Sequence, residues 1–112
     1  MEFRNLKIYQ PDGTFRSGGL SISGDRITGT EAGSDAADMG GLYAVPGLVD
    51  LHFHGCMGYD FCDGTAEAIS AIASYQAQNG VAGICPATMT YPEEKLSEIA
   101  QAAAAWSAEP HE

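Results

Sequence analysis

The chain of 112 residues has few cysteines and no long apolar run. Its three cysteines are odd in number and lack the spacing of a zinc ribbon, so they predict no disulfide framework. No apolar run approaches the roughly 20 residues that cross a bilayer, so we expect no membrane span. The start, Met1 to Arg4, lacks the basic and apolar segments of a secretory signal. We therefore expect a cytoplasmic protein.

Positive charge is also scarce, because five Lys and Arg stand against fifteen Asp and Glu, for a formal net charge of −10. Nucleic acids and anionic membranes carry charge of the same sign, so we expect neither as a partner. Lys95 is the only Lys or Arg after Asp50, so an anionic substrate would need positive charge from elsewhere. A content of 45% hydrophobic and 18% charged residues is typical of a globular protein.

The first part of the chain predicts short β-strands. The expected strands are Phe3 to Tyr9, Leu20 to Ser23 and Arg26 to Thr30. Gly24-Asp25 between the last two is typical of a hairpin, which favours a β-meander. Glu31 to Gly41 has no apolar periodicity and predicts a loop, which leads to Leu42 to Val45. We expect a boundary near Pro46, with residues 1–45 as a first domain.

Strands and helices alternate in the second part, residues 46–112. The expected elements are a strand at Leu48 to His54, a helix from about Thr65 to Asn79, a strand at Val81 to Cys85 and a helix from about Tyr91 to Ser107. Gly80 predicts a left-handed cap after the first helix, and Thr90 with Glu93 predicts a capping box for the second.

This alternation predicts an α/β fold with parallel strands, because a parallel connection needs a covering crossover helix. Two strands and two helices would leave sheet edges unpaired and apolar faces wet. We therefore expect the opening β-α-β-α units of a larger (β/α) barrel or sheet, incomplete in these residues.

Histidines at alternate positions of the predicted strand indicate a metal site. Alternation would place Asp50, His52 and His54 on one face of the strand. Val49, Leu51 and Phe53 would lie on the other face. Buried imidazoles need partners, and a divalent cation would satisfy them at the carboxyl end of the strand, where barrels build active sites. The alternative is a pair of core histidines that bond neighbouring strands.

Cysteines and the last residues are weaker candidates. Cys56 continues the alternation and would complete a zinc-type His, His, Cys face, but a strand end at Gly55 favours an ordinary free thiol. We interpret Cys62 and Cys85 as packing residues. We interpret His111 and Glu112 as a solvated connection rather than as ligands.

The stretch Val45 to Gly55 resembles the first-strand motif of the amidohydrolase superfamily of metal-dependent (β/α)8 hydrolases. Further stretches are similar to its N-acetylglucosamine-6-phosphate deacetylase family, and the resemblance runs from about Leu42 to Leu96. These stretches are Gly58-Tyr59-Asp60 with Asp63-Gly64-Thr65, Gly80-Val81 and Pro86-Ala87-Thr88-Met89-Thr90.

The resemblance implies a TIM-type (β/α)8 barrel preceded by N-terminal strands of a small β-sandwich. It implies hydrolysis of N-acetylglucosamine 6-phosphate to glucosamine 6-phosphate and acetate, in amino-sugar metabolism, and a homodimer of the full-length form. His52 and His54 would be metal ligands, and Asp50 is a candidate to orient one of them by a hydrogen bond. Zinc is the first choice of metal, and iron, cobalt and nickel are alternatives.

Some members of the family lack the histidine pair and use one metal held by other ligands, so both histidines here indicate an open second metal position. The later ligands and the aspartate that moves the proton match no residue of this chain, so we expect these residues alone to be inactive. Substrate-binding residues are not assigned. The alternatives are another amidohydrolase, such as a dihydroorotase-like cyclic amidase or a deaminase, and a non-catalytic truncated piece stabilised by association.

Overall fold

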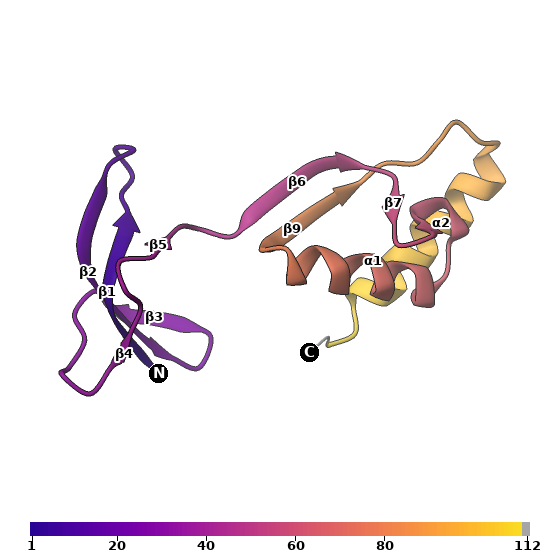
Figure 1. Cartoon of the computed structure of the whole chain (residues 1–112). Coiled ribbons are helices and arrows are strands. Elements are labelled where there is room, and N and C mark those ends of the chain that lie inside the picture. The colour runs from indigo at the N-terminus through magenta and orange to yellow at the C-terminus, as the bar shows by residue number, and fades with distance from the viewer. Residues whose placement is uncertain (111–112) are drawn as a thin grey trace. The chain divides into compact units, whose positions relative to one another are not determined.

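The structure is a computed structural model that describes residues 1–110 of the chain. It divides into two compact units, Met1–Pro46 and a second that begins at Gly47. Figure 1 shows a unit of strands and a unit in which strands and helices alternate. Neither α-helix within residues 1–110 has both the length and the apolar character that crossing a membrane requires.

The first unit is one mixed sheet. Its strands are β1 (Glu2–Tyr9), β2 (Phe15–Ser23), β3 (Arg26–Gly29), β4 (Ala37–Asp38) and β5 (Tyr43–Ala44). Strands β3, β2 and β1 are antiparallel neighbours, which confirms the predicted meander. Strands β4 and β5 both pair with the free edge of β1 in parallel. The short strand β4 lies inside the segment that the sequence predicts to be a loop, so that prediction is wrong at these two residues.

The backbone conformation of Asn5 explains why β1 pairs with two short strands, β4 before Asn5 and β5 after it. Its φ is 59°, a left-handed conformation that Asn tolerates better than most residues, and the register of β1 with β2 shifts between Phe3 and Leu6. The Asn5 side-chain amide donates to Asp38 Oδ1 at 3.0 Å. Asp38 also pairs with Arg4 at 2.8 Å, so two neighbours of the bulge hold β4 in place.

The second unit is built on a parallel pair of strands. Its elements are β6 (Leu48–Phe53), β7 (Gly55–Cys56), β8 (Tyr59–Asp60), the 3-10 turn η1 (Phe61–Asp63), α1 (Ala66–Gln78), β9 (Val81–Pro86) and α2 (Glu93–Ser107). Strands β6 and β9 lie side by side and run in the same direction, and α1 makes the return connection (Figure 1). This arrangement confirms the predicted parallel crossover.

The two helices begin differently from each other. Thr65 caps α1 by accepting the Ala68 N–H at 3.2 Å, and Gly80 follows the helix at φ +80°, as predicted. The capping box predicted for α2 is wrong, because Pro92 is the N-cap and no side chain bonds there. A residue before proline avoids the helical region, so the helix starts after Pro92 and Glu93 becomes its first residue rather than its third.

The core of this unit lies between α1, α2 and η1. Phe61, Cys62, Ile69 and Ile99 form one buried cluster. Ile72 and Ile99 are 1% exposed, and their burial follows the apolar stripe of each helix. By contrast, Val49 and Leu51 of β6 are 58% and 74% exposed. One face of the parallel pair is therefore covered by helices and the other is open.

Candidate metal site

Towards its carboxyl end, strand β6 contains one extra residue relative to β9, whereas β9 contains the extra residue nearer its start, between Val81 and Gly83. Asp50 pairs with Ile84 and Phe53 pairs with Pro86, so three positions on β6 match two positions on β9. Paired residues project on the same face of a sheet, so Asp50 and Phe53 share a face despite their odd separation. Ile84 and Pro86 line a hollow with Trp106 of α2, which identifies this face as the one beneath the helices.

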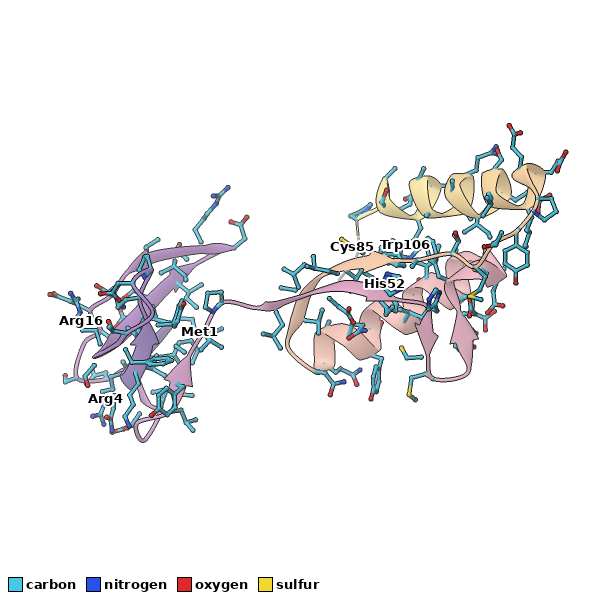
Figure 2. All side chains as sticks on the ribbon, turned by 90° about the horizontal axis from the view of Figure 1, so that it is seen from above. Met1, Arg4, Arg16, His52, Cys85 and Trp106 are labelled. Atoms are coloured by element: carbon cyan, nitrogen blue, oxygen red, sulfur yellow. The ribbon has the colours of Figure 1, made fainter. Side chains whose placement is uncertain are left out.

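The extra residue decides where the histidines point. His52 and His54 flank Phe53, and neighbours on a strand project on opposite faces, so both imidazoles point away from the helices. His52 is exposed and His54 is half-buried. Figure 2 marks His52 and Cys85 on the neighbouring strands β6 and β9. The open face therefore carries the imidazoles at the carboxyl end of β6.

Asp50 does not share this face, so the prediction that it does is wrong. Its carboxylate accepts the side-chain amide of Gln76 on α1 at 3.3 Å and the backbone N–H of His52 at 3.2 Å. These two bonds direct Asp50 to the helices. Strict alternation along β6 failed because the extra residue is set by pairing with β9, which the local pattern does not contain.

The two imidazole rings lie next to each other. Their centroids are 5.2 Å apart and their planes are inclined by 87°. Nδ1 of His54 is 2.9 Å from the carbonyl oxygen of Ala87, which follows β9. A carbonyl can only accept, so Nδ1 carries the proton and the neutral ring keeps its lone pair on Nε2. That nitrogen can bind a metal.

Ala87 contacts the candidate site, and the sequence analysis did not single it out. It bonds His54 through a backbone atom, so no side-chain pattern could reveal it. The signal that the sequence does offer is the place of Ala87 in the stretch Pro86 to Thr90, which resembles the deacetylase family. Ala87 also donates its N–H to the Phe53 carbonyl at 2.8 Å, so both its N–H and its carbonyl bond residues at the end of β6.

A tight hairpin follows the histidines. Strands β7 and β8 are joined by Met57 and Gly58 at φ 56° and 82°, the values of a type I′ turn. A Cβ on Gly55 would collide with the Tyr59 carbonyl oxygen, so glycine is required there for close backbone approach. Tyr59 donates its hydroxyl to Glu67 at 3.0 Å, and that bond raises the pKa of Tyr59. The hairpin is thus tied to α1.

The cysteines do not extend the pair of histidines. Within residues 1–110, no three His, Cys, Asp or Glu side chains are grouped closely enough to hold a metal ion, so Cys56 is not a third ligand there. Cys62 is buried, as predicted, and burial raises the pKa of its thiol. Cys85 is exposed within the described residues, so the interpretation of Cys85 as a packing residue is wrong for this part of the chain. His111 and Glu112 lie outside the described residues.

Comparisons with known proteins agree with the motifs. A deacetylase of N-acetylglucosamine 6-phosphate from Vibrio furnissii is 35% identical over 71 residues, which are 62% of this chain and 18% of that protein. The mouse and human proteins of the same name are 26% identical over 99% of this chain and 30% of their own length. The chain resembles part of N-acetylglucosamine-6-phosphate deacetylases. The resemblance noted in the sequence is confirmed.

The fold agrees with the same family. The crystal structure of N-acetylglucosamine-6-phosphate deacetylase from Thermotoga maritima matches with a TM-score of 0.80 at 24% identity, over 96% of this chain and 28% of that one. The two chains therefore share a fold over this region. No model of a protein family matches the sequence. The chain spans 18 to 30% of the length of these deacetylases from Vibrio furnissii, mouse and human.

Proposed function

We propose that these residues form the opening part of an N-acetylglucosamine-6-phosphate deacetylase, a hydrolase that yields glucosamine 6-phosphate and acetate. The activity belongs to a protein of the relatives' length, of which this chain supplies two metal ligands. The likeness over 99% of the chain to deacetylases of this name supports the substrate. The paired imidazoles at the end of β6, with Nε2 of His54 left free, are the observation that supports the chemistry.

The proposed architecture is a (β/α)8 barrel preceded by a small β-sandwich. The parallel pair β6 and β9 with crossover helix α1 is the repeating unit of such a barrel. The open face of β6, with Val49 and Leu51, would be the barrel interior, which apolar side chains fill. The mixed sheet of residues 1–46 would be one contribution to the sandwich. A cytoplasmic homodimer is part of the same proposal.

His52 and His54 would hold a divalent metal, with zinc as the first choice. Zinc accepts imidazole nitrogen as a ligand, and the two ring centroids are 5.2 Å apart, so the imidazoles are near enough to each other to share one cation. A bound metal of this kind lowers the pKa of its water and polarises an amide carbonyl. Further ligands would come from outside these residues.

The chain's own groups orient the ligand rather than perform the proton transfer. The Ala87 carbonyl fixes the tautomer of His54, and the Phe61 N–H binds the His54 carbonyl at 2.7 Å. Both the ring and the backbone carbonyl of His54 are therefore held in place before a metal binds. Preorganised ligands lower the cost of binding, because less side-chain freedom is lost.

The test is metal content together with activity of the full encoded protein. We expect His52→Ala and His54→Ala each to lose about one metal equivalent per chain by elemental analysis, and to deacetylate N-acetylglucosamine 6-phosphate at least tenfold more slowly. His111→Ala is the matched control and should retain both. Unchanged metal content in His52→Ala and His54→Ala would show that the pair is not a metal site.

Dihydroorotate assayed beside N-acetylglucosamine 6-phosphate tests the substrate. Hydrolysis of dihydroorotate alone would move the protein to the cyclic amidases while leaving the metal ligands in place. Failure of the wild type to bind metal or to hydrolyse either compound would favour the non-catalytic alternative. Deacetylation that depends on both histidines supports the proposal as stated.

A further inference from the structure

The segment that carries Ala87 is held at a second point, beyond β9. Strand β9 ends at Pro86 and helix α2 begins at Glu93, so residues 87–92 lie outside both elements. Met89 in this segment donates its N–H to the sulfur of Cys62 at 3.3 Å. Cys62 is in η1, which follows the hairpin of the histidine strand. The segment therefore runs between the histidine on one side and a buried thiol on the other.

Cys62 is itself fixed in position. It is 6% exposed and packs with Phe61, Ile69 and Ile99. Its backbone N–H donates to the Asp60 carboxylate at 2.7 Å. Asp60 is the N-cap of η1 and forms a capping box with Asp63. Burial raises the pKa of the thiol, which therefore stays neutral and accepts the amide as a weak acceptor. A group with so little freedom can act as an anchor for the segment.

The two contacts lie two residues apart on one short segment. The Ala87 carbonyl bonds His54 and the Met89 N–H bonds Cys62, so loss of the second contact leaves this carbonyl held only from its β9 side, where the Ala87 N–H bonds Phe53. An imidazole released from its acceptor can exchange between two tautomers, and only one of them presents an unprotonated Nε2. The position of the Met89 amide is thereby linked to the state of the His54 ring.

We propose that Cys62 is a positioning residue of the metal site. By accepting the Met89 N–H, it holds the Ala87 carbonyl against Nδ1 of His54 and keeps Nε2 available to the metal. This inference rests on the proposed function, because it takes His54 to be a ligand. Loss of a group that bonds a metal ligand directly lowers affinity about 10 to 100-fold. Cys62 acts one contact further away, so we expect a loss of about three- to tenfold.

Three variants of the full encoded protein test this role. Cys62→Ala removes the acceptor, and Cys62→Ser replaces sulfur by an oxygen that can still accept the amide. Ile99→Val removes one methylene from the same buried cluster without touching the hydrogen bond, so it controls for looser packing. Circular dichroism of each variant establishes that it is folded before any comparison.

Two readouts are needed for each variant. The first is the tautomer of His54 in the metal-free protein, from ring 15N shifts at a pH of about 8.5, above the ordinary imidazole pKa. We expect the Nδ1–H form in the wild type and in Ile99→Val, a mixture in Cys62→Ala, and partial recovery in Cys62→Ser. The second is zinc affinity by competition with a chelator, which should weaken about three- to tenfold in Cys62→Ala, by less in Cys62→Ser, and not in Ile99→Val.

The outcomes separate this inference from the proposed function. An unchanged tautomer in Cys62→Ala, or an equal loss of zinc affinity in Ile99→Val, overturns the role of Cys62 even if the wild type binds zinc. A wild type that binds no zinc overturns the proposed function, whereas a tautomer that still responds to Cys62→Ala preserves the link between Cys62 and His54.

Discussion

Asp50 and Phe53 project on the same face of β6, although they are three positions apart and strict alternation would place them on opposite faces. This relationship turns His52 and His54 to the open face and leaves Asp50 bonded to Gln76 beneath the helices. It also gives Asp50 a different role from the two histidines of the same motif. Asp50 joins the strand to α1, while both imidazoles lie on the open face and His54 keeps Nε2 available to a metal.

The hairpin after the histidines should be sensitive to glycine replacement in a position-dependent way. Gly55→Ala forces a Cβ against the Tyr59 carbonyl and to 2.8 Å from the Asp60 Cα, so it should destabilise the second unit by about 3 kcal/mol. Gly58→Ala meets no atom within 4 Å and adds only left-handed strain at φ +82°, about 1 kcal/mol. Urea unfolding of both variants measures the difference. Equal destabilisation would contradict the close approach of the two strands at Gly55.

Replacement of Thr65 and of Thr90 by alanine should change the free energy of unfolding by different amounts, although each threonine lies just before a helix. Thr65 accepts the Ala68 N–H at 3.2 Å as the cap of α1, so Thr65→Ala should cost about 1 kcal/mol of unfolding free energy. Thr90→Ala should change it by less than about 0.5 kcal/mol, because Pro92 rather than Thr90 caps α2. Thermal unfolding of the pair decides between them, and a comparable loss at both positions would restore the capping box at Thr90.

Truncation of the helix core should be costly. Ile72 is 1% exposed on the buried face of α1, so Ile72→Ala should destabilise the protein by about 2 to 5 kcal/mol through lost burial and a cavity. Ile27→Ala serves as the control, because its side chain is 66% exposed and should lose less than about 0.5 kcal/mol. Chemical denaturation followed by far-ultraviolet circular dichroism reports both values. A small effect at Ile72 would mean that the helices do not pack as described.

Asp38 should make the first unit sensitive to acid. The Gly40 N–H, followed by the Asn5 amide, holds the pKa of Asp38 below its ordinary value of 3.8. A carboxylate with a lowered folded-state pKa stabilises the protein above the unfolded pKa, and this contribution is lost as pH falls through the folded value. The loss should therefore begin near pH 3.8 and continue below it.

Asp38→Asn checks this expectation. The variant should show a flatter decline of unfolding temperature between pH about 5 and pH about 2.5 than the wild type. Asp25→Asn is the control, because the Asp25 side chain is 88% exposed. An identical pH profile for the wild type and Asp38→Asn would show that these hydrogen bonds do not hold in solution.

Local signals predicted most of the elements. The meander, the crossover helix and the left-handed cap at Gly80 each depend on residues close together in the sequence, and each was predicted from them. Two predictions failed for a shared reason. The face of Asp50 depends on pairing with β9, and the start of α2 depends on how Pro92 restricts Tyr91, so neither follows from spacing alone.

The candidate site was predictable only as far as side chains reveal it. His52 and His54 stand out by residue type, and their adjacent rings agree with the expectation that they act together. The Ala87 carbonyl is a backbone group, and alanine is used in many environments without any polar role. Its contact with His54 required the three-dimensional position of the segment after β9.

The mismatch between β6 and β9 makes the lengths of these strands as important as their composition. If one codon were gained between Ile84 and Pro86, regular pairing of the two strands would return, and both imidazoles would turn to the face of Asp50 under the helical layer. The pattern of histidines would survive in the gene, and a motif search would still find it. Natural variants of this region should therefore exchange side chains far more often than they gain or lose positions.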